Sequence, residues 1–541
     1  MAITDVRDDI TIGDLWREAV ARWPERPFLA VPPNPDRNYL PEGCELTYAE
    51  ADREIAALVE AYRAAGYGLG SRVALLMDNR PGHVLHRFAL NMLGVGCVPL
   101  NPDYRPAETA YVLGHSRPCL LLTVPERQAQ AEAALAASAH KPPIHITETA
   151  APIPDAPSRA RPGTPTPSTE AQILYTSGTT GRPKGCILSH GYEVSVGDWY
   201  ARLGGVAALR PGEDRIYNPL PLYHVNAGIV SLLGAVASGS CQIQTDRFNP
   251  RRWWREVKAT RATVVHYLGI VAPMLLGQPP DAADRDHAVR LGIGAGIEPG
   301  LHAEFEQRFG FPMVEIWGMT EFVRVLGDTH APRQIGTRAF GKAVPGLDVR
   351  VVDEHDRDVP DGTPGEMLVR HSAATPRRGA FSGYLDNDTE TEHAWRGGWF
   401  HTGDTVWRGP DGMHHFVDRK KNIIRRSGEN IAAAEIEALL LTHPDVAQVA
   451  VMAVGDEVRE EEVLACVVTR SGRSDEAMAG ELFAFCMERL AYYKAPGWLW
   501  FSSGLPTTGT QKIQKHVIFP DHADPRKAPG MIDLRPGKRR G

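Results

Sequence analysis

The segment from residue 172 to residue 190 combines glycines, hydroxyl side chains and a lysine in a pattern suited to binding phosphate. A short apolar stretch leads into Thr176, Ser177, Gly178, Thr179, Thr180, Gly181 and Lys184. Glycines let consecutive backbone N–H groups point at one anion, and the hydroxyls and the lysine add donors. The spacing of the glycines to Lys184 does not fit a Walker A loop. On composition alone, a Gly/Thr hairpin loop remains an alternative.

Five further segments contain carboxylates, aromatic rings or lysines, beside glycines in all of them except 416–424. They are VEIWGMTE at 314–321, GWFHTGD at 398–404, FVDRKKNII at 416–424, SGENI at 427–431 and LPTTGTQKIQK at 505–515. Together with the loop at 175–185, they resemble the motifs of the adenylate-forming superfamily, which includes acyl-CoA synthetases, adenylation domains and luciferases. The resemblance covers almost the whole chain. Residues 417–470 and 222–226 are most similar to the carnitine/crotonobetaine-CoA ligase and medium-chain acyl-CoA synthetase group.

The resemblance implies an enzyme that joins a carboxylic acid to AMP, releases pyrophosphate and passes the acyl group to coenzyme A. Negative charge gathers on the α-phosphorus in the transition state, so such a site needs cations and N–H donors rather than a nucleophile. The expected cofactors are ATP, Mg²⁺ and coenzyme A. The expected partner is a small-molecule carboxylic acid.

The same resemblance assigns catalytic roles to four residues. Lys512 would bridge the acyl carboxylate and the α-phosphate, and Lys515 is a weaker candidate because Gln511 stands where the motif usually has glycine. Thr320 would contact the α-phosphate, and His224 would gate the acyl pocket. Glu321 is the expected Mg²⁺ ligand, since this hard cation prefers a carboxylate together with phosphate oxygens. Thr176 is the second residue expected at the metal.

Nucleotide-binding roles follow from the resemblance as well. Trp317 would stack on adenine, opposite the backbone of Gly294, Ala295 and Gly296, while Asp404 and Arg419 would bind the ribose. Tryptophan keeps the aromatic face of the more common tyrosine but lacks its hydroxyl. The other residues expected near nucleotide or coenzyme A are Glu315, Ile316, Gly318, Met319, Lys421, Ser427, Gly428 and Glu429.

The acyl pocket is expected near residues 223–226, 266–269 and 294–296 and near Met319. Glycines at 269, 294 and 296 leave room for a medium-chain or aryl acid. His266 is either a pocket residue or a core histidine on a buried strand. The acceptor also has alternatives to coenzyme A, namely a carrier-protein phosphopantetheine, an amine, or nitrite-dependent diazotisation. A non-enzymatic nucleotide-binding scaffold is disfavoured because Lys184, Glu321, Asp404, Arg419 and Lys512 are all present.

Alternating helix and strand patterns must position these residues. Residues 46–65 show amphipathic helical spacing with Thr47 as N-cap, and 72–77 is a short apolar run typical of a buried strand. The predicted fold is α/β, with a large N-terminal domain of two doubly wound α/β layers and a small β-rich subdomain, followed by a smaller mobile α+β domain. The expected parts are an AMP- and acyl-binding domain at 1–417, a hinge at 418–422, a C-terminal domain at 423–520 and a basic flexible tail at 521–541.

Composition limits the remaining function classes. The 541 residues carry a formal net charge of −7, which excludes a globally basic nucleic-acid binder. The seven cysteines are scattered without a C-x-x-C pair, so neither a disulfide framework nor a zinc module is expected. Acidic residues near the start argue against a signal peptide, and proline and histidine interrupt the uncharged runs at 216–245 and 262–280. We therefore expect a cytoplasmic enzyme without membrane insertion, and a homodimer is left open.

Overall fold

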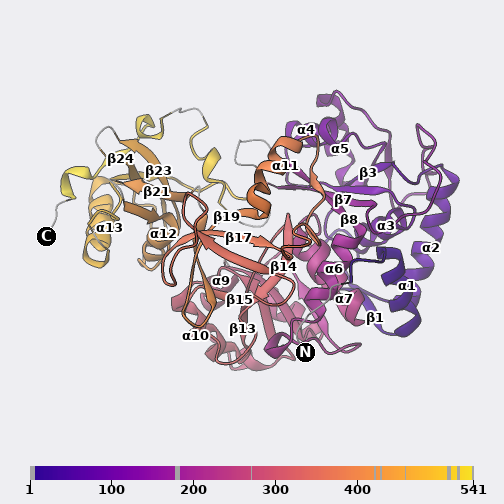
Figure 1. Cartoon of the computed structure of the whole chain (residues 1–541), viewed down its shortest axis with the longest axis horizontal. Helices are drawn as coiled ribbons and strands as arrows, with labels where there is room; N and C mark the ends of the chain where they lie inside the picture. Colours follow the sequence, from indigo (N-terminus) through magenta and orange to yellow (C-terminus); the bar gives the residue numbers. More distant parts are fainter. Residues whose placement is uncertain are drawn as a thin grey trace. The chain divides into compact units, whose positions relative to one another are not determined.

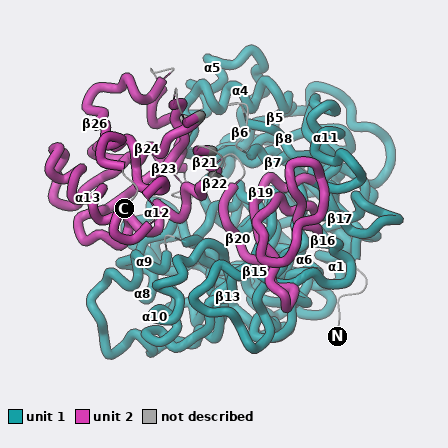
Figure 2. Tube along the Cα trace, turned by 60° about the vertical axis from the view of Figure 1, so that its left-hand side comes forward, with its two compact units in different colours: residues 1–349, 369–400 teal, residues 350–368, 401–541 magenta. Residues whose placement is uncertain are grey.

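The computed structural model divides the chain into two compact units (Figure 2). The first comprises residues 1–349 and 369–400, and the second comprises residues 350–368 and 401–541. The structure describes residues 7–176, 183–269, 271–419, 422–426, 429–456, 459–490, 492–508, 513–520 and 524–538. Within these ranges, no helix is both long enough and apolar enough to span a bilayer.

The first sheet of unit 1 has seven strands in the order β18-β8-β7-β4-β3-β5-β6. Its strands are β3 (Arg72–Leu76), β4 (Gly96–Pro99), β5 (Leu120–Thr123), β6 (Ile144–Ile146), β7 (Glu170–Thr176), β8 (Lys184–Ser189) and β18 (Gly383–Tyr384). Strands β3 to β6 run parallel, and residues 73–76 of β3 are fully buried, as expected for a strand covered on both faces. In Figure 1, helices α4 and α5 lie on one side of this sheet and α3 lies on the other.

The second sheet of unit 1 has eight strands in the order β14-β13-β12-β11-β9-β10-β1-β2. Its strands are β1 (Pro27–Val31), β2 (Cys44–Thr47), β9 (Arg215–Asn218), β10 (Cys241–Gln244), β11 (Val264–Leu268), β12 (Leu291–Ala295), β13 (Met313–Met319) and β14 (Phe322–Gly327). The central strands are parallel, while β2 and β14 close the two edges in antiparallel pairs. The uncharged runs at 216–245 and 262–280 include most residues of β9, β10 and β11, which are largely buried.

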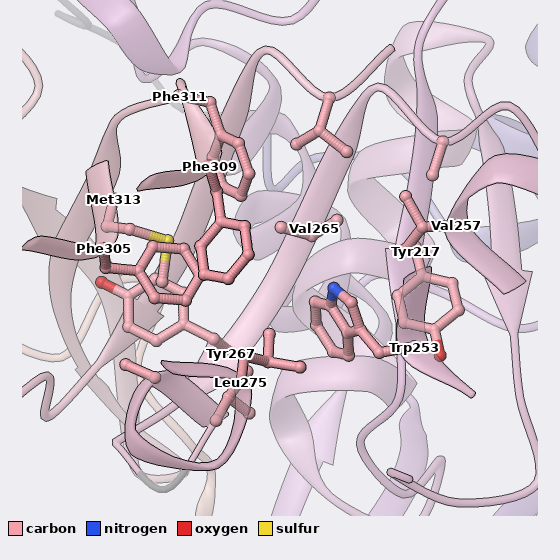
Figure 3. Packing of buried hydrophobic residues seen from close by; sticks show 14 of the residues in the cluster. Tyr217, Trp253, Val257, Val265, Tyr267, Leu275, Phe305, Phe309, Phe311 and Met313 are labelled. Atoms are coloured by element: carbon pink, nitrogen blue, oxygen red, sulfur yellow. The ribbon is translucent and has the colours of Figure 1, made fainter. Parts of the chain in front are cut away.

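Helices cover both sheets of unit 1. They are α1 (Ile12–Arg22), α2 (Tyr48–Ala64), α3 (Pro81–Met92), α4 (Pro106–Ser116), α5 (Gln128–Ala137), α6 (His190–Ala201), α7 (Leu232–Ser238), α8 (Trp253–Ala259), α9 (Val271–Leu276), α10 (Pro299–Phe309) and α11 (Asp388–Ala394). The Thr47 side chain caps α2 and forms a capping box with Glu50, which confirms the predicted helix start. Behind the eight-stranded sheet, Trp253, Phe305 and Phe309 pack into a cluster of aromatic and aliphatic side chains (Figure 3).

Two further sheets consist mainly of residues of unit 2. Strands β16 (Asp348–Val352), β17 (Gly365–Arg370), β19 (Phe400–Arg408) and β20 (Met413–Arg419) lie in the order β20-β19-β17-β16. The C-terminal sheet has the order β22-β21-β24-β25-β26, with β23 paired to β24. Its strands are β21 (Ile423–Arg426), β22 (Glu429–Ala432), β23 (Val446–Asp456), β24 (Glu460–Thr469), β25 (Trp498–Phe501) and β26 (Ile532–Asp533). Helices α12 (Ala433–Leu441) and α13 (Glu476–Arg489) pack on this sheet through buried apolar side chains.

The C-terminal tail differs from the flexible segment predicted at 521–541. Strand β26 pairs antiparallel with β25, and Arg535 forms an ion pair with Asp456 at 2.9 Å. Lys538 is buried, where its Nζ donates to Glu462 Oε1 at 2.7 Å, while Arg426 donates to the other oxygen of Glu462 at 2.8 Å. Sequence composition missed this docking because the proline-rich segment has few apolar residues, and its contacts combine ion pairs with packing of Met531, Ile532 and Leu534 against the domain core.

Replacing Glu462 with glutamine should destabilise the C-terminal sheet. The substitution leaves two cations, Arg426 and Lys538, buried without a carboxylate, which we expect to lower the free energy of unfolding by about 3–5 kcal/mol. Urea unfolding measures the change, and Glu488→Gln is the matched control, since the ion pair that the described residues give Glu488 is an exposed one with Arg489. Adding Lys538→Met to Glu462→Gln should recover part of the loss. Absence of any recovery would show that Lys538 is not held by Glu462.

Candidate active site

The hairpin of β7 and β8 places the two described ends of the predicted phosphate loop side by side. Thr176 and Lys184 are partners across this antiparallel pair. Residues Ser177, Gly178, Thr179 and Thr180 lie outside the described residues. The hairpin therefore brings a hydroxyl group and an ammonium group together at one end of the sheet. A hairpin loop with no role in binding would not require either group.

Backbone and side-chain hydrogen bonds hold the turn at Thr320 and Glu321, which joins β13 to β14. The Tyr192 hydroxyl on α6 donates to the carbonyl oxygen of Thr320 at 2.8 Å. The Phe381 N–H donates to the carbonyl oxygen of Glu321 at 2.9 Å. The Tyr384 hydroxyl donates to Oε1 of the buried Glu321 carboxylate at 3.0 Å. Burial, followed by the charge of Glu321, raises the pKa of Tyr384 well above its ordinary range, so the phenol remains a donor.

The donor set around Glu321 fits a magnesium ion that is held partly by phosphate. Among the residues that the structure describes, no three His, Cys, Asp or Glu side chains are grouped so that they could hold a metal. Mg²⁺ is commonly bound by one or two carboxylates together with substrate phosphates and water. Glu321 would supply the carboxylate. The Thr176 hydroxyl lies 3.9 Å from the sulfur of Cys186, the residue two places beyond Lys184 on β8.

A buried carboxylate shapes the backbone where adenine is expected. Oε2 of Glu315 accepts from the Gly296 N–H at 2.8 Å, and Oε1 accepts from Ile297 N–H at 3.1 Å and the Tyr267 hydroxyl at 2.6 Å. Gly296 has φ of +85°, a conformation that favours glycine. Glu315 therefore acts on the predicted adenine site by fixing the backbone that directly follows β12, at Gly296 and Ile297. Burial raises the pKa of Glu315.

The other predicted adenine residues lie along β13. Trp317 is buried, and its ring centroid lies 6.4 Å from that of Phe340. Ile316 is also buried, whereas Gly318 is exposed and Met319 is half-buried at the end of the strand. The strand thus changes from core to surface at the position that the resemblance assigns to the nucleotide.

His266 and His224 have different environments. His266 on β11 is fully buried, with Nδ1 donating to Asn226 at 2.9 Å and Nε2 accepting from the Tyr200 hydroxyl at 2.8 Å. Burial lowers its pKa to about 3, so the ring is neutral. These contacts confirm the core alternative for His266. His224 is half-buried, and its ring lies 4.7 Å from the Tyr223 ring at a tilt of 48°, two residues before the π-helix Asn226–Ser231.

In unit 2, the two predicted ribose residues face each other. Asp404 on β19 and Arg419 on β20 are cross-strand partners, and Arg419 Nε lies 2.7 Å from Asp404 Oδ1. Asp404 is almost completely buried, and its N–H donates to the Thr402 hydroxyl at 3.1 Å. The hairpin therefore fixes the carboxylate before any ligand arrives.

Several predicted residues of unit 2 cannot be placed. Lys421, Ser427, Gly428 and Lys512 lie outside the described residues. Glu429 begins β22, and its side chain is likewise not described. The weaker lysine candidate, Lys515, forms an ion pair with Glu437 at 2.8 Å.

Two side chains that the sequence reasoning missed lie beside Lys184. The Lys184 ammonium forms an ion pair with Glu390 on α11. It also lies 5.0 Å from the centroid of the Tyr384 ring, within range of a cation–π contact. Both residues come about 200 positions after Lys184 in the sequence. Local spacing around the phosphate loop therefore could not have indicated that they lie beside Lys184.

Comparison with known proteins agrees with this geometry. Residues 16–385 match the AMP-binding enzyme family, and residues 435–512 match the AMP-binding enzyme C-terminal domain. The chain is 31% identical over 490 residues to a crotonobetaine/carnitine–CoA ligase of Escherichia coli O157:H7, covering 86% of this chain and 92% of that protein. These matches confirm the resemblance stated above.

Solved structures share the fold. A benzoate CoA ligase from Burkholderia xenovorans LB400 superposes with a TM-score of 0.78 at 23% identity, covering 94% of this chain and 99% of that one. O-succinylbenzoate coenzyme A synthetase from Bacillus subtilis, in complex with AMP, gives 0.77 at 23% identity, covering 93% and 97%. The predicted α/β class, with a large N-terminal and a smaller C-terminal domain, is therefore confirmed.

Replacing His266 with glutamine should make the free energy of unfolding less dependent on pH below pH 7. The native ring is neutral, with a pKa of about 3, and the unfolded ring gains a proton near pH 6.5, so lowering the pH favours unfolding. Between pH 7 and pH 5, the wild type should lose about 2 kcal/mol more than His266→Gln. Urea unfolding at both pH values measures the difference. Equal losses would contradict a buried neutral histidine.

Proposed function

Because the chain belongs to the AMP-binding enzyme family, we propose that it is an AMP-forming acyl-CoA ligase. It converts a carboxylic acid and ATP to an acyl-adenylate and pyrophosphate, and then transfers the acyl group to coenzyme A with release of AMP. The observation that supports this most directly is Tyr384, which donates to Glu321 and lies over Lys184. One ring thereby brings the expected phosphate lysine and the expected magnesium carboxylate together.

In the first half-reaction, a carboxylate oxygen of the acid attacks the α-phosphorus and pyrophosphate leaves. Lys184 and Thr176, paired across the hairpin, would bind the β- and γ-phosphates. Thr320, fixed by Tyr192, would contact the α-phosphate. Bound Mg²⁺ supplies positive charge at the phosphate oxygens, and Glu321 would be its protein ligand. These fixed groups favour the developing charge because they need little reorganisation as it appears.

Unit 2 would supply the remaining groups. Asp404, fixed by Arg419, would bind the ribose hydroxyls. We propose that Lys512 bridges the carboxylate and the α-phosphate, and that the segment 418–422, with Lys421, is the hinge between domains ending at 417 and beginning at 423. Ser427, Gly428 and Glu429 would approach the acyl site during thioester formation.

The proposal also covers the acid substrate, the cellular location and the oligomeric state. We propose a small or medium-chain acid, with crotonobetaine and carnitine as the first candidates because they are named for the relatives at 31% identity. His224 would lie at the pocket entrance. We expect the enzyme in the cytoplasm. A homodimer is a separate expectation, to be tested by light scattering.

An acid panel separates the acceptors. Crotonobetaine, carnitine, medium-chain and aryl acids are each incubated with ATP and Mg²⁺, with and without coenzyme A. Pyrophosphate release that requires both ATP and one acid, followed by a coenzyme A thioester detected by mass spectrometry, supports the proposal. Adenylation of an acid without any thioester would overturn the coenzyme A step and favour a carrier protein or an amine as the acceptor.

Substitutions of Lys512 and Lys515 can be compared to test which lysine acts in the adenylation step. We expect Lys512→Ala to slow acid-dependent exchange of pyrophosphate into ATP by about 10²- to 10³-fold, because a charged donor at the developing charge is lost. Lys515→Ala should reduce the rate less than about threefold, since Lys515 pairs with Glu437. The reverse ranking would make Lys515 the catalytic lysine.

A further inference from the structure

The lysine of the phosphate loop already has an anionic partner. Lys184 pairs with the carboxylate of Glu390, and the exposed fractions of the two side chains are 14% and 34%. The Tyr384 ring covers the same ammonium from 5.0 Å. This pair is therefore shielded from water on more than one side, which makes it stronger than a fully exposed surface pair.

Local hydrogen bonds hold Glu390 in this position. The Asn387 side chain caps α11 by accepting from the Glu390 N–H at 3.1 Å. The adjacent Thr391 hydroxyl accepts from the Tyr384 N–H at 2.9 Å and donates to the Asn387 carbonyl at 2.9 Å. These bonds tie the start of α11 to the strand that contains Tyr384. The carboxylate is thus presented to Lys184 by a fixed backbone.

A second glutamate of the same helix provides the contrast. Glu392 pairs with Arg377 at 2.6 Å, but both side chains are exposed, at 66% and 45%. Neither of these two residues contacts a predicted site residue through an ion pair that the structure describes. Of the two acids, Glu390 is therefore the one whose charge acts on the phosphate loop.

We propose that Glu390 is a placeholder for phosphate, which neutralises Lys184 in the nucleotide-free enzyme and is displaced by the β- and γ-phosphates of ATP. This inference rests on the function proposed above. Two effects of Glu390 have the same sign: its carboxylate competes for Lys184, and once displaced it repels the polyphosphate nearby. Glu390 therefore weakens the binding of ATP and pyrophosphate. It should not weaken the binding of AMP, which lacks both outer phosphates.

Calorimetric titration tests this without turnover. The ligands are α,β-methylene-ATP with Mg²⁺, pyrophosphate with Mg²⁺, and AMP, and the proteins are the wild type, Glu390→Gln and the control Glu392→Gln. We expect Glu390→Gln to bind α,β-methylene-ATP and pyrophosphate about 3- to 10-fold more tightly, a change typical of a partly shielded ion pair. AMP affinity should stay within twofold, and Glu392→Gln should match the wild type for all three ligands.

A cycle with Lys184→Met isolates the competition. In that background, Glu390→Gln should gain clearly less than it does beside Lys184, because only the repulsion is relieved and no lysine remains to be released. Unchanged or weaker triphosphate binding by Glu390→Gln, or an equal gain for AMP, would overturn the role of Glu390 while leaving the proposed function intact. Failure of the wild type to bind any of the three ligands would instead overturn the proposed function, and this inference with it. Thermal unfolding confirms that each variant is folded.

Discussion

The short pairing of β18 with β8 is the constraint on which the candidate site of unit 1 depends. Tyr384 is the backbone partner of Cys186, so its ring is delivered to the strand that begins at Lys184. Its hydroxyl reaches Glu321 from there. A shift of one residue would turn the side chain to the opposite face of the sheet. The backbone pairing of Tyr384 with Cys186 therefore determines whether Lys184 and Glu321 both contact the Tyr384 side chain.

The second requirement is that buried charge be fully hydrogen-bonded. A carboxylate removed from water costs several kcal/mol unless donors compensate for the lost hydration. Glu315 meets this with two backbone N–H groups and a phenol. The same bonds fix the backbone around Gly296. The hydrogen bonds that compensate for the buried charge of Glu315 therefore also restrain this part of the backbone.

Sequence reasoning succeeded where chemistry is encoded locally. The N-cap at Thr47 and the apolar strand that leads into the phosphate loop could be predicted because propensity and periodicity act over a few residues. The contacts of Glu390 and Tyr384 could not, since they join segments about 200 residues apart. His266 stayed ambiguous for a related reason: its role depends on whether Tyr200 and Asn226 meet its two ring nitrogens.

The C-terminal tail shows a different limit of composition. A composition rich in proline and basic residues predicts a flexible segment, yet the Lys538 side chain is buried and forms an ion pair with Glu462. Carboxylates also pair with cations that were considered above for the nucleotide. Lys184, Arg419 and Lys515 each face a carboxylate, respectively Glu390, Asp404 and Glu437. In a chain with a net charge of −7, individual cations are thus held in fixed positions beside acids, and binding one polyanion depends on such placed cations rather than on net charge.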